Sequence, residues 1–257
     1  MKEEKPKYGW YVRDLMIYFY LIGLVGLLTF ISGIFIGNIF GIILIIIGIP
    51  LLLIFLWPAI GLTLMQVILI NKLNVADISG KIKVIEELIN PQILDIGCGT
   101  GRAAIKIAKE LKNGGHLYGI DIYEKSAISG NALHTVQNNA RIEGVKDKTT
   151  FQYGSATEIP FEDNQFEIIN ISSVLHEVHS SNGKEKAMQE IYRVLKPGGY
   201  TYISEWNRNS WQLISTLGIF CFVFKNKKYW YELIEKNKFK ILSYENYSGF
   251  GYFICKK

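Results

Sequence analysis

Three glycines at alternate positions are the first feature of the sequence that indicates chemistry. Residues 93–101 read ILDIGCGTG, and an apolar periodicity typical of a helix follows at once. Glycine lets the backbone turn with positive φ and lets a ligand lie against bare main chain. The N–H groups that open the next helix favour a carboxylate or a phosphate. The segment therefore predicts a strand, a ligand-binding turn and a helix.

The spacing of these glycines separates two classes of ligand. A dinucleotide-binding turn has the pattern G-x-G-x-x-G, but here Gly101 comes one position too early and Arg102 follows it. The pattern D-x-G-x-G-x-G instead resembles motif I of the class I S-adenosylmethionine-dependent methyltransferases. An ordinary tight turn between strand and helix stays open at this point, so the rest of the chain must decide.

Three further stretches strengthen this resemblance. Asp121 ends the next predicted strand, where a carboxylate accepts hydrogen bonds from ribose hydroxyls, as it also does in nicotinamide enzymes. Residues 153–167, YGSATEIPFEDNQFE, resemble the family's G-D-A-x-x-L-P-F-x-D-x-x-F-D segment, and residues 190–199, EIYRVLKPGG, resemble its turn into the fifth strand. The resemblance spans about residues 80 to 206 and is greatest to the ubiquinone/menaquinone-type branch and to bacterial methyltransferases of unassigned substrate.

The resemblance implies a set of cofactor-binding residues for S-adenosylmethionine. Three glycines form the floor under the cofactor, two acids hold its ammonium and its ribose, and four residues border the adenine or the methionine end. In this sequence they are Gly97, Gly99, Gly101, Asp95, Asp121, Ile122, Ser155, Ala156 and Ser172. Ser155 stands where the family usually has an aspartate beside the adenine amino group, so we expect weaker cofactor binding than is usual.

Two residues just beyond predicted strands are candidates for catalysis. The sulfonium methyl group is already activated, so alignment supplies most of the protein's contribution, and a base is needed only for a protonated nucleophile. His176 can act as that base, orient the substrate or be a structural histidine, and imidazole titrates near neutral pH. Glu205 is the second candidate, with a solvated cap as the alternative. His176 and His179 do not form H-E-x-x-H, so we predict no metal site.

Alternating strand and helix patterns position these residues. This alternation predicts an α/β fold with a Rossmann-like, seven-stranded, mostly parallel sheet and helices on both faces. The expected strands cover residues 92–96, 116–121, 150–153, 167–172, 200–206, 240–245 and 251–255. The expected helices cover residues 78–89, 101–112, 131–143, 183–195 and 228–237.

A long apolar run precedes this domain. Residues 15–71 contain no charged side chain. A run of this length is too long for one bilayer span of roughly 20 residues and fits two spans. We expect spans over residues 15–36 and 39–57 with a turn at Gly37-Asn38, and an interfacial helix over residues 58–69 that begins at Pro58. A signal peptide fits poorly because no cleavage site precedes the second span. A buried core hairpin is the other alternative, but the rest of the chain offers too little surface to bury it.

The positive charges indicate the orientation and exclude one class of partner. Lysines and Arg13 precede the first span, and Lys72, Lys81 and Lys83 follow the second, so both ends are expected in the cytoplasm. The net charge of +5 resides largely in residues 225–257, where eight lysines face three glutamates. Near a membrane such lysines attract anionic headgroups, and no nucleic-acid signature accompanies them. Three scattered cysteines are compatible with a reducing compartment.

The sequence therefore predicts a multi-pass membrane protein. We expect a cytoplasmic N-terminal arm over residues 1–14, a transmembrane hairpin with an interfacial helix over 15–73 and a methyltransferase domain over 74–257. An apolar insertion over residues 208–225 is either a helix packed on the sheet or a lid at the membrane interface. The expected acceptor is hydrophobic or lipid-like; the alternatives are a non-catalytic S-adenosylmethionine-binding module and, less favoured, a nicotinamide oxidoreductase.

Overall fold

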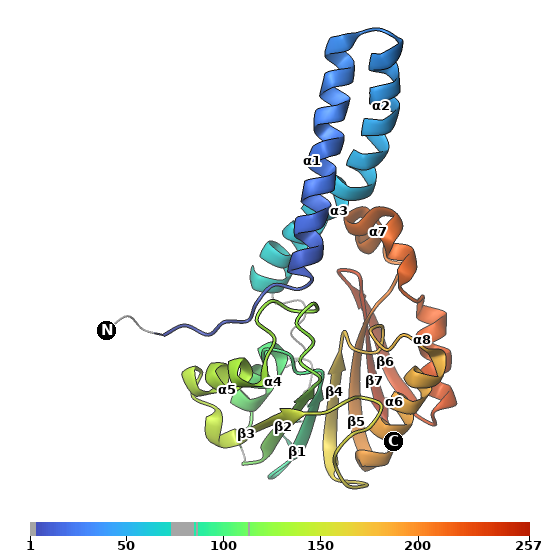
Figure 1. The fold of residues 1–257 in the computed structure, drawn as a ribbon. Helices are drawn as coiled ribbons and strands as arrows, with labels where there is room; N and C mark the ends of the chain where they lie inside the picture. Colours follow the sequence, from blue (N-terminus) through green and yellow to red (C-terminus); the bar gives the residue numbers. More distant parts are fainter. Residues whose placement is uncertain (1–3, 73–84, 86, 113) are drawn as a thin grey trace.

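The computed structural model of the chain (Figure 1) describes residues 4–72, 85, 87–112 and 114–257. The helix expected over residues 78–89 lies mostly outside these residues, as do Lys81 and Lys83, so this helix and the charges after the second span stay predictions. The part of the chain that is described contains a sheet with helices on both faces and a helical hairpin that projects from one edge of that sheet.

A single seven-stranded sheet forms the centre of the domain. Its order is β3-β2-β1-β4-β5-β7-β6, and only β7 runs antiparallel to its neighbours. The predicted fold class is thus confirmed, and each expected strand is found within a few residues of its expected bounds. The strands are β1 (Gln92–Ile96), β2 (His116–Asp121), β3 (Thr149–Tyr153), β4 (Phe166–Ser172), β5 (Leu195–Trp206), β6 (Lys240–Tyr247) and β7 (Phe250–Lys256).

Helices cover both faces because the central strands are apolar on both sides. Along β1, Ile93 packs into one core and Leu94 into the other, as the alternation of side chains along a strand requires. The first core receives α4 (Arg102–Lys109) and α5 (Leu133–Ile142), and the second receives α6 (Ser181–Val194) and α8 (Lys227–Lys236). A short 3-10 helix, η5 (Lys146–Lys148), precedes β3.

The hairpin consists of two helices that pack through glycines. The first, α1 (Arg13–Ile36), ends at Gly37, and α2 (Ile39–Leu51) begins after Asn38, whose side chain accepts hydrogen bonds from two backbone N–H groups of α2. The two helices meet so closely that a Cβ atom on Gly33 would lie 2.6 Å from the carbonyl oxygen of Gly41. Small residues permit this approach between helices in lipid.

The second apolar helix is longer than expected. We expected a break at Pro58, but α2 continues through η1 (Leu52–Leu56) and α3 (Trp57–Leu64) into η2 (Met65–Lys72). Pro58 occupies the first turn of α3, and the π-helical turns of η1 precede it, which shows how the helix absorbs the missing N–H group without ending. Residues 13–36 and 39–68 are both long and apolar enough to cross a membrane, and only 22% and 11% of their most apolar windows are buried.

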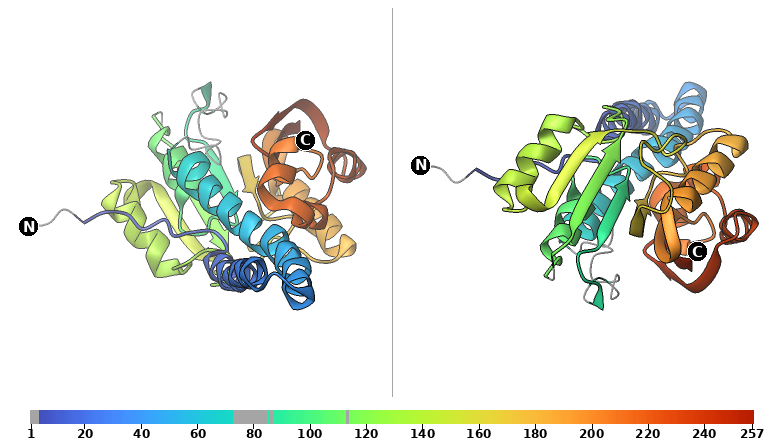
Figure 2. Two further views of the ribbon diagram at one scale, coloured as in Figure 1. Left: turned by 90° about the horizontal axis from the view of Figure 1, so that it is seen from above. Right: turned by 90° about the horizontal axis from the view of Figure 1, so that it is seen from below.

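The hairpin stands above the edge of the sheet where the parallel strands end. Figures 1 and 2 show α3 and η2 crossing over that edge, and α7 (Trp211–Leu217) beside them. The indole of Trp57 donates a hydrogen bond of 2.7 Å to the carbonyl oxygen of Ser215. The expected insertion thus forms α7 and the 3-10 helix η6 (Gly218–Val223), and it packs on the base of the hairpin rather than on the sheet face.

We predict that replacement of Gly48 by leucine opens the hairpin. A Cβ atom on Gly48 would lie 2.7 Å from the backbone nitrogen of Phe30, so a larger side chain must separate the helices at a cost of about 1–3 kcal/mol. Unfolding of the full chain in mixed micelles, followed by circular dichroism, measures this loss. Ile46→Leu, on the exposed side of α2, is the matched control, and equal unfolding midpoints for the two variants would contradict the packing described.

Candidate active site

The glycine loop between β1 and α4 is tied to the neighbouring strand β2. The backbone nitrogens of Gly97 and Cys98 both donate to the carbonyl oxygen of Ile120, at 2.8 and 3.1 Å. Gly97, Gly99 and Gly101 have φ angles of 72°, 54° and 89°, values that residues other than glycine rarely adopt. The three predicted glycines therefore form one turn, as expected, and this turn opens directly onto the N-terminus of α4.

Asp121 holds this loop from the tip of β2. Its Oδ2 atom accepts a hydrogen bond from the backbone nitrogen of Gly99 at 2.8 Å, and its Oδ1 atom accepts one from the nitrogen of Tyr123 at 2.5 Å. Burial raises the pKa of Asp121, and these backbone donors lower it. The carboxylate still has lone pairs for further donors, which suits the predicted contact with ribose hydroxyls.

Asp95 is a buried carboxylate, and only one of its two oxygen atoms has a hydrogen-bond partner among the described residues. The side-chain amide of Asn170 donates to its Oδ1 atom at 2.5 Å, because the register of β1 and β4 places the two residues side by side. The Oδ2 atom has no hydrogen-bond partner among the described residues. Burial raises the pKa of Asp95 to about 7 although Asn170 lowers it. Burial of Asp95 therefore makes folding less favourable as the pH rises from the ordinary pKa of about 3.9 to 7, and the penalty is constant at higher pH. A cation at Oδ2 would offset that cost.

The remaining predicted cofactor-binding residues differ in the groups that they can offer to a ligand. Ile122, directly after Asp121, is 64% exposed and offers an apolar surface at the tip of β2. The Ser155 hydroxyl lies 2.9 Å from the hydroxyl of Thr157 and accepts from its backbone nitrogen, so it is partly engaged. Ala156 packs into the hydrophobic core, which leaves only its backbone for a ligand. Ser172 ends β4 beside the glycine loop.

His176 and Glu205 form a pair at the tips of β4 and β5. The Nδ1 atom of His176 lies 2.9 Å from Oε2 of Glu205, and its Nε2 atom lies 3.1 Å from Oε1 of Glu177. Burial lowers the pKa of His176, but the carboxylates of Glu205 and Glu177 raise it more, to about 9. The imidazole is therefore protonated at neutral pH and serves as a fixed cation, which favours an orienting role over that of a base.

Burial excludes the alternative interpretation of Glu205 as a solvated cap, and its role as a catalytic candidate stays a prediction. Its side chain is fully buried, and its Oε1 atom accepts hydrogen bonds from the backbone nitrogens of Val174 and Leu175 at 3.0 and 2.6 Å. Glu205 therefore fixes both the loop after β4 and the ring of His176. Val174 also lies against the glycine loop, since a Cβ atom on Gly97 would be 2.1 Å from its Cγ2 atom. This contact joins the histidine pair to the glycine loop.

Three residues belong to this site that sequence reasoning did not assign to it. Asn170 is a buried amide in an otherwise apolar strand, and that exception is a signal, because buried polar groups need partners. Asn131 donates to Asp121 at 3.4 Å, while its own Oδ1 atom is buried without a partner, facing Gly99. Tyr11 comes from the N-terminal arm, where burial raises the pKa of its hydroxyl and the nearby charge of Arg102 lowers it. No sequence pattern indicates this third contact.

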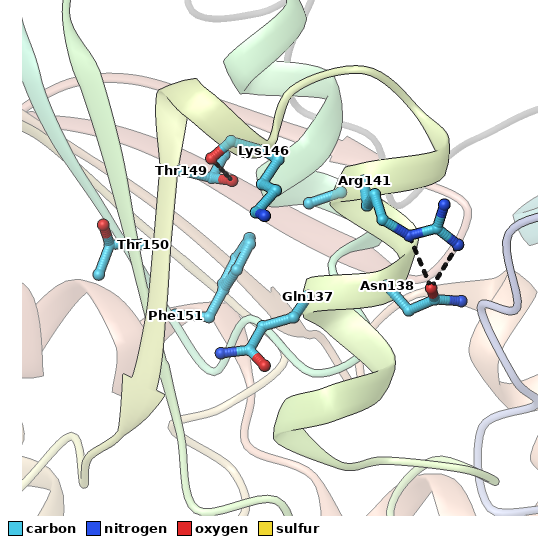
Figure 3. A pocket seen from close by; sticks show the side chains of 8 residues that line it. Gln137, Asn138, Arg141, Lys146, Thr149, Thr150 and Phe151 are labelled. Atoms are coloured by element: carbon cyan, nitrogen blue, oxygen red, sulfur yellow. Dashed lines mark hydrogen bonds between the residues drawn. The ribbon is translucent and has the colours of Figure 1, made fainter.

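A separate hollow lies on the flank of the sheet, between α5 and β3 (Figure 3). Polar side chains line most of it, and the Arg141 guanidinium there is hydrogen-bonded to the Asn138 side chain. It is distant from the strand tips and gathers none of the candidate residues. Within the described part of the chain, no three His, Cys, Asp or Glu residues come together as a metal site.

The residues around the glycine loop fit S-adenosylmethionine. Buried oxygen atoms of Asp95 and Asn131 lack donors, and the cofactor carries an ammonium group and hydroxyls that supply them. Val174 and Ile128 pack where Cβ atoms on Gly97 and Gly99 would lie, so the close packing of the loop requires glycine at both positions. Asp121 at the tip of β2 suits a ribose. These features also agree with the spacing that disfavours a dinucleotide.

Comparison with known proteins supports the same assignment. Residues 90–246 match the family of the methyltransferase domain. A demethylmenaquinone methyltransferase of Lactiplantibacillus plantarum is 37% identical over 109 residues, which are 42% of this chain and 42% of that protein. A ubiquinone/menaquinone biosynthesis C-methyltransferase of Vibrio cholerae is 32% identical over 126 residues, which are 49% of this chain and 45% of that protein. The match thus spans less than half of these relatives.

The fold is shared with solved structures at low identity. A SAM-dependent methyltransferase from Aquifex aeolicus superposes with a TM-score of 0.59 at 17% identity, over 77% of this chain and 97% of that one. The likeness concerns the sheet and its helices. With the family match over more than half of the sequence, it leads to one conclusion: this chain belongs to the methyltransferase-domain family, the class I enzymes whose cofactor is S-adenosylmethionine.

Proposed function

We propose that this protein is a membrane-anchored methyltransferase that transfers the methyl group of S-adenosylmethionine to a membrane-resident acceptor. The observation that carries the proposal is the position of the hairpin. It stands over the carboxyl edge of the sheet (Figures 1 and 2). The glycine loop and the pair of His176 and Glu205 lie at the ends of strands that finish at this edge. If the two apolar helices cross a bilayer, the active-site mouth faces the membrane surface, and both chain ends lie on the cytoplasmic side.

The exposed side of the insertion supports a contact with lipid. Leu213 and Leu217 of α7 are buried against the hairpin, whereas Trp211 and Phe222 are 75% and 68% exposed. Exposed lysines follow at positions 225, 227 and 228. An apolar surface flanked by lysines is typical of segments that lie at a membrane interface. The insertion is thus a lid at the membrane interface that admits a hydrophobic acceptor to the site.

The named relatives indicate a class of acceptor. The proteins of L. plantarum and V. cholerae are named for methyl transfer in menaquinone and ubiquinone biosynthesis. A quinone-type ring carbon is therefore our first candidate acceptor, followed by a polar-lipid amine or hydroxyl. When bound, S-adenosylmethionine supplies an activated methyl group on a positive sulfur. Tethering raises the local concentration of a membrane-resident acceptor at the site.

The protein's own residues then have distinct tasks. Asp121 accepts hydrogen bonds from the ribose hydroxyls, and the glycine loop lies under the cofactor. Asp95 faces the ammonium group. The His176 imidazolium orients an oxygen of the acceptor through its Nε2–H group, which the exposed Glu177 carboxylate must first release, because Glu205 holds the Nδ1–H group. Glu205 positions His176 and keeps it charged.

We expect methyl label to enter the lipid fraction. The full chain in nanodiscs is incubated with methyl-labelled S-adenosylmethionine and either a membrane extract, demethylmenaquinol or a water-soluble extract. Label is expected in the chloroform-soluble products alone. Label only in water-soluble products would contradict the membrane acceptor, and bound cofactor without any labelled product would show a non-catalytic module.

The same assay tests the insertion with a matched control. The double variant Phe222→Ser/Val223→Ser is expected to lower transfer to a bilayer acceptor by tenfold or more, because burial of each side chain contributes about 1.5–3 kcal/mol. Binding of S-adenosylhomocysteine should not change. Leu242→Ser, which removes an exposed apolar side chain of β6, is the control. Equal activities of the two variants would show that the insertion has no part in the entry of the acceptor.

We predict that Glu205→Gln lowers the pKa of His176 from about 9 to near its ordinary value of about 6.5. The variant removes the carboxylate that raises the pKa and leaves the burial that lowers it. The pH titration of the His176 resonances by NMR measures the change, with Glu124→Gln as control. Because the folded pKa is raised, the stability that the pair contributes in the wild type is lost as pH rises through 9. An unchanged His176 titration in Glu205→Gln would refute the pairing.

A further inference from the structure

The N-terminal arm, residues 4–12, is fastened directly to the glycine loop. The buried side chain of Asn139 accepts a hydrogen bond from the backbone nitrogen of Lys7 at 2.8 Å and donates one to its carbonyl oxygen at 2.9 Å. The same amide donates to the carbonyl oxygen of Thr100 at 2.9 Å. The Thr100 hydroxyl in turn donates to the carbonyl oxygen of Tyr8 at 2.8 Å. One buried asparagine and one loop hydroxyl thus bind the arm to the turn under the cofactor.

A second fastening joins the arm to the segment that covers Gly99. The backbone nitrogen of Trp10 donates to the Ser129 hydroxyl at 2.8 Å, and the nitrogen of Ser129 donates to the carbonyl oxygen of Trp10 at 2.9 Å. Between them Tyr11 pairs with Ile128 in an antiparallel bridge. The Cδ1 atom of Ile128 lies 2.8 Å from where a Cβ atom of Gly99 would be. The arm and this segment therefore cover the loop together.

These fastenings bring Tyr11 to the N-terminus of α4. Its backbone nitrogen donates to Oε1 of the buried Gln66 side chain at 3.2 Å. Burial raises the pKa of its hydroxyl, and two nearby charges act on that pKa in opposite directions: the Arg102 guanidinium lowers it and the Asp95 carboxylate raises it. Arg102 also lies over the Tyr8 ring, with its guanidinium carbon 5.1 Å from the ring centre. The arm thus supplies the ring that covers this arginine.

Two buried atoms beside Tyr11 lack partners and carry opposite charge. The Nε atom of Arg102 has no acceptor, and the Oδ2 atom of Asp95 has no donor. Buried charged groups of this kind call for a ligand, and an amino acid in its zwitterionic form supplies both a carboxylate and an ammonium. The N-terminus of α4 adds its positive end to the same place.

We infer that Tyr11 and Arg102 bind the carboxylate at the amino-acid end of the cofactor, with Asp95 on the ammonium. The assignment rests on the proposed function, because it takes S-adenosylmethionine as the ligand. The Tyr11 hydroxyl accepts from Arg102 and donates to the ligand carboxylate. α1 begins at Arg13, so a residue of the cofactor site is set by the first helix of the hairpin.

Two ligands that differ only at the amino-acid end test this inference. The full chain in nanodiscs is titrated calorimetrically with S-adenosylhomocysteine and with 5′-methylthioadenosine, which lacks the ammonium and the carboxylate. Tyr11→Phe is expected to weaken binding of S-adenosylhomocysteine by about tenfold, the loss of one hydrogen bond to a charged group. Arg102→Gln should weaken it further. Binding of 5′-methylthioadenosine should stay within about twofold of wild type in both variants.

The controls separate this inference from the proposed function. Tyr18→Phe, on the exposed side of α1, should change the affinity for neither ligand. Equal losses for both ligands in Tyr11→Phe would show that the arm only supports the loop, and no loss for either would remove Tyr11 from the site; both results overturn the inference. If the wild-type protein binds neither ligand, the proposed function itself is wrong and the inference falls with it.

Discussion

The carboxylate of Asp121 is the interaction on which the rest of the site depends. It joins the tip of β2 to the glycine loop through the nitrogen of Gly99 and to the segment after β2 through Tyr123 and Asn131. A loop with three glycines has little conformational preference of its own, so this carboxylate and the carbonyl oxygen of Ile120 determine its shape. The segment that Asn131 ends then reaches the N-terminal arm through Ile128 and Ser129.

This chain of contacts connects the hairpin to the chemistry from two sides. On one side the arm leads from the glycine loop into α1. On the other, Val174 touches Gly97 and donates to Glu205, and the ring of His176 contacts Phe224, the residue that follows η6. The base of the hairpin packs on α7 and η6, with Phe19 and Phe55 of the hairpin and Phe220 of η6 in mutual contact. The hairpin, the insertion and the edge of the sheet that carries the candidate site therefore form one packed unit.

Much of this was predictable because it depends on local pattern. The strand ending in Asp95 and the turn after it follow from an apolar run and from glycines that require positive φ, and Asp121 follows from its place at the end of the next strand. The helix through Pro58 was not, because a proline in a helix can be absorbed by a local π-turn, which depends on the neighbouring helix. Burial of Glu205, the inward side chain of Ala156 and the arrival of Tyr11 depend on contacts between segments far apart in sequence, which no spacing reveals.

Calorimetric titration of the detergent-purified chain with S-adenosylhomocysteine and, separately, with NADH tests the cofactor assignment most directly. The account predicts binding of the sulfur ligand and none of NADH. It also predicts that Asp121→Ala weakens the binding by tenfold or more, since a carboxylate that accepts ligand hydroxyls contributes about 1.5–3 kcal/mol per hydrogen bond, whereas Asp147→Ala, an exposed acid in η5, leaves it unchanged. Binding of NADH alone would contradict the interpretation of the glycine loop and direct the search to an oxidoreductase.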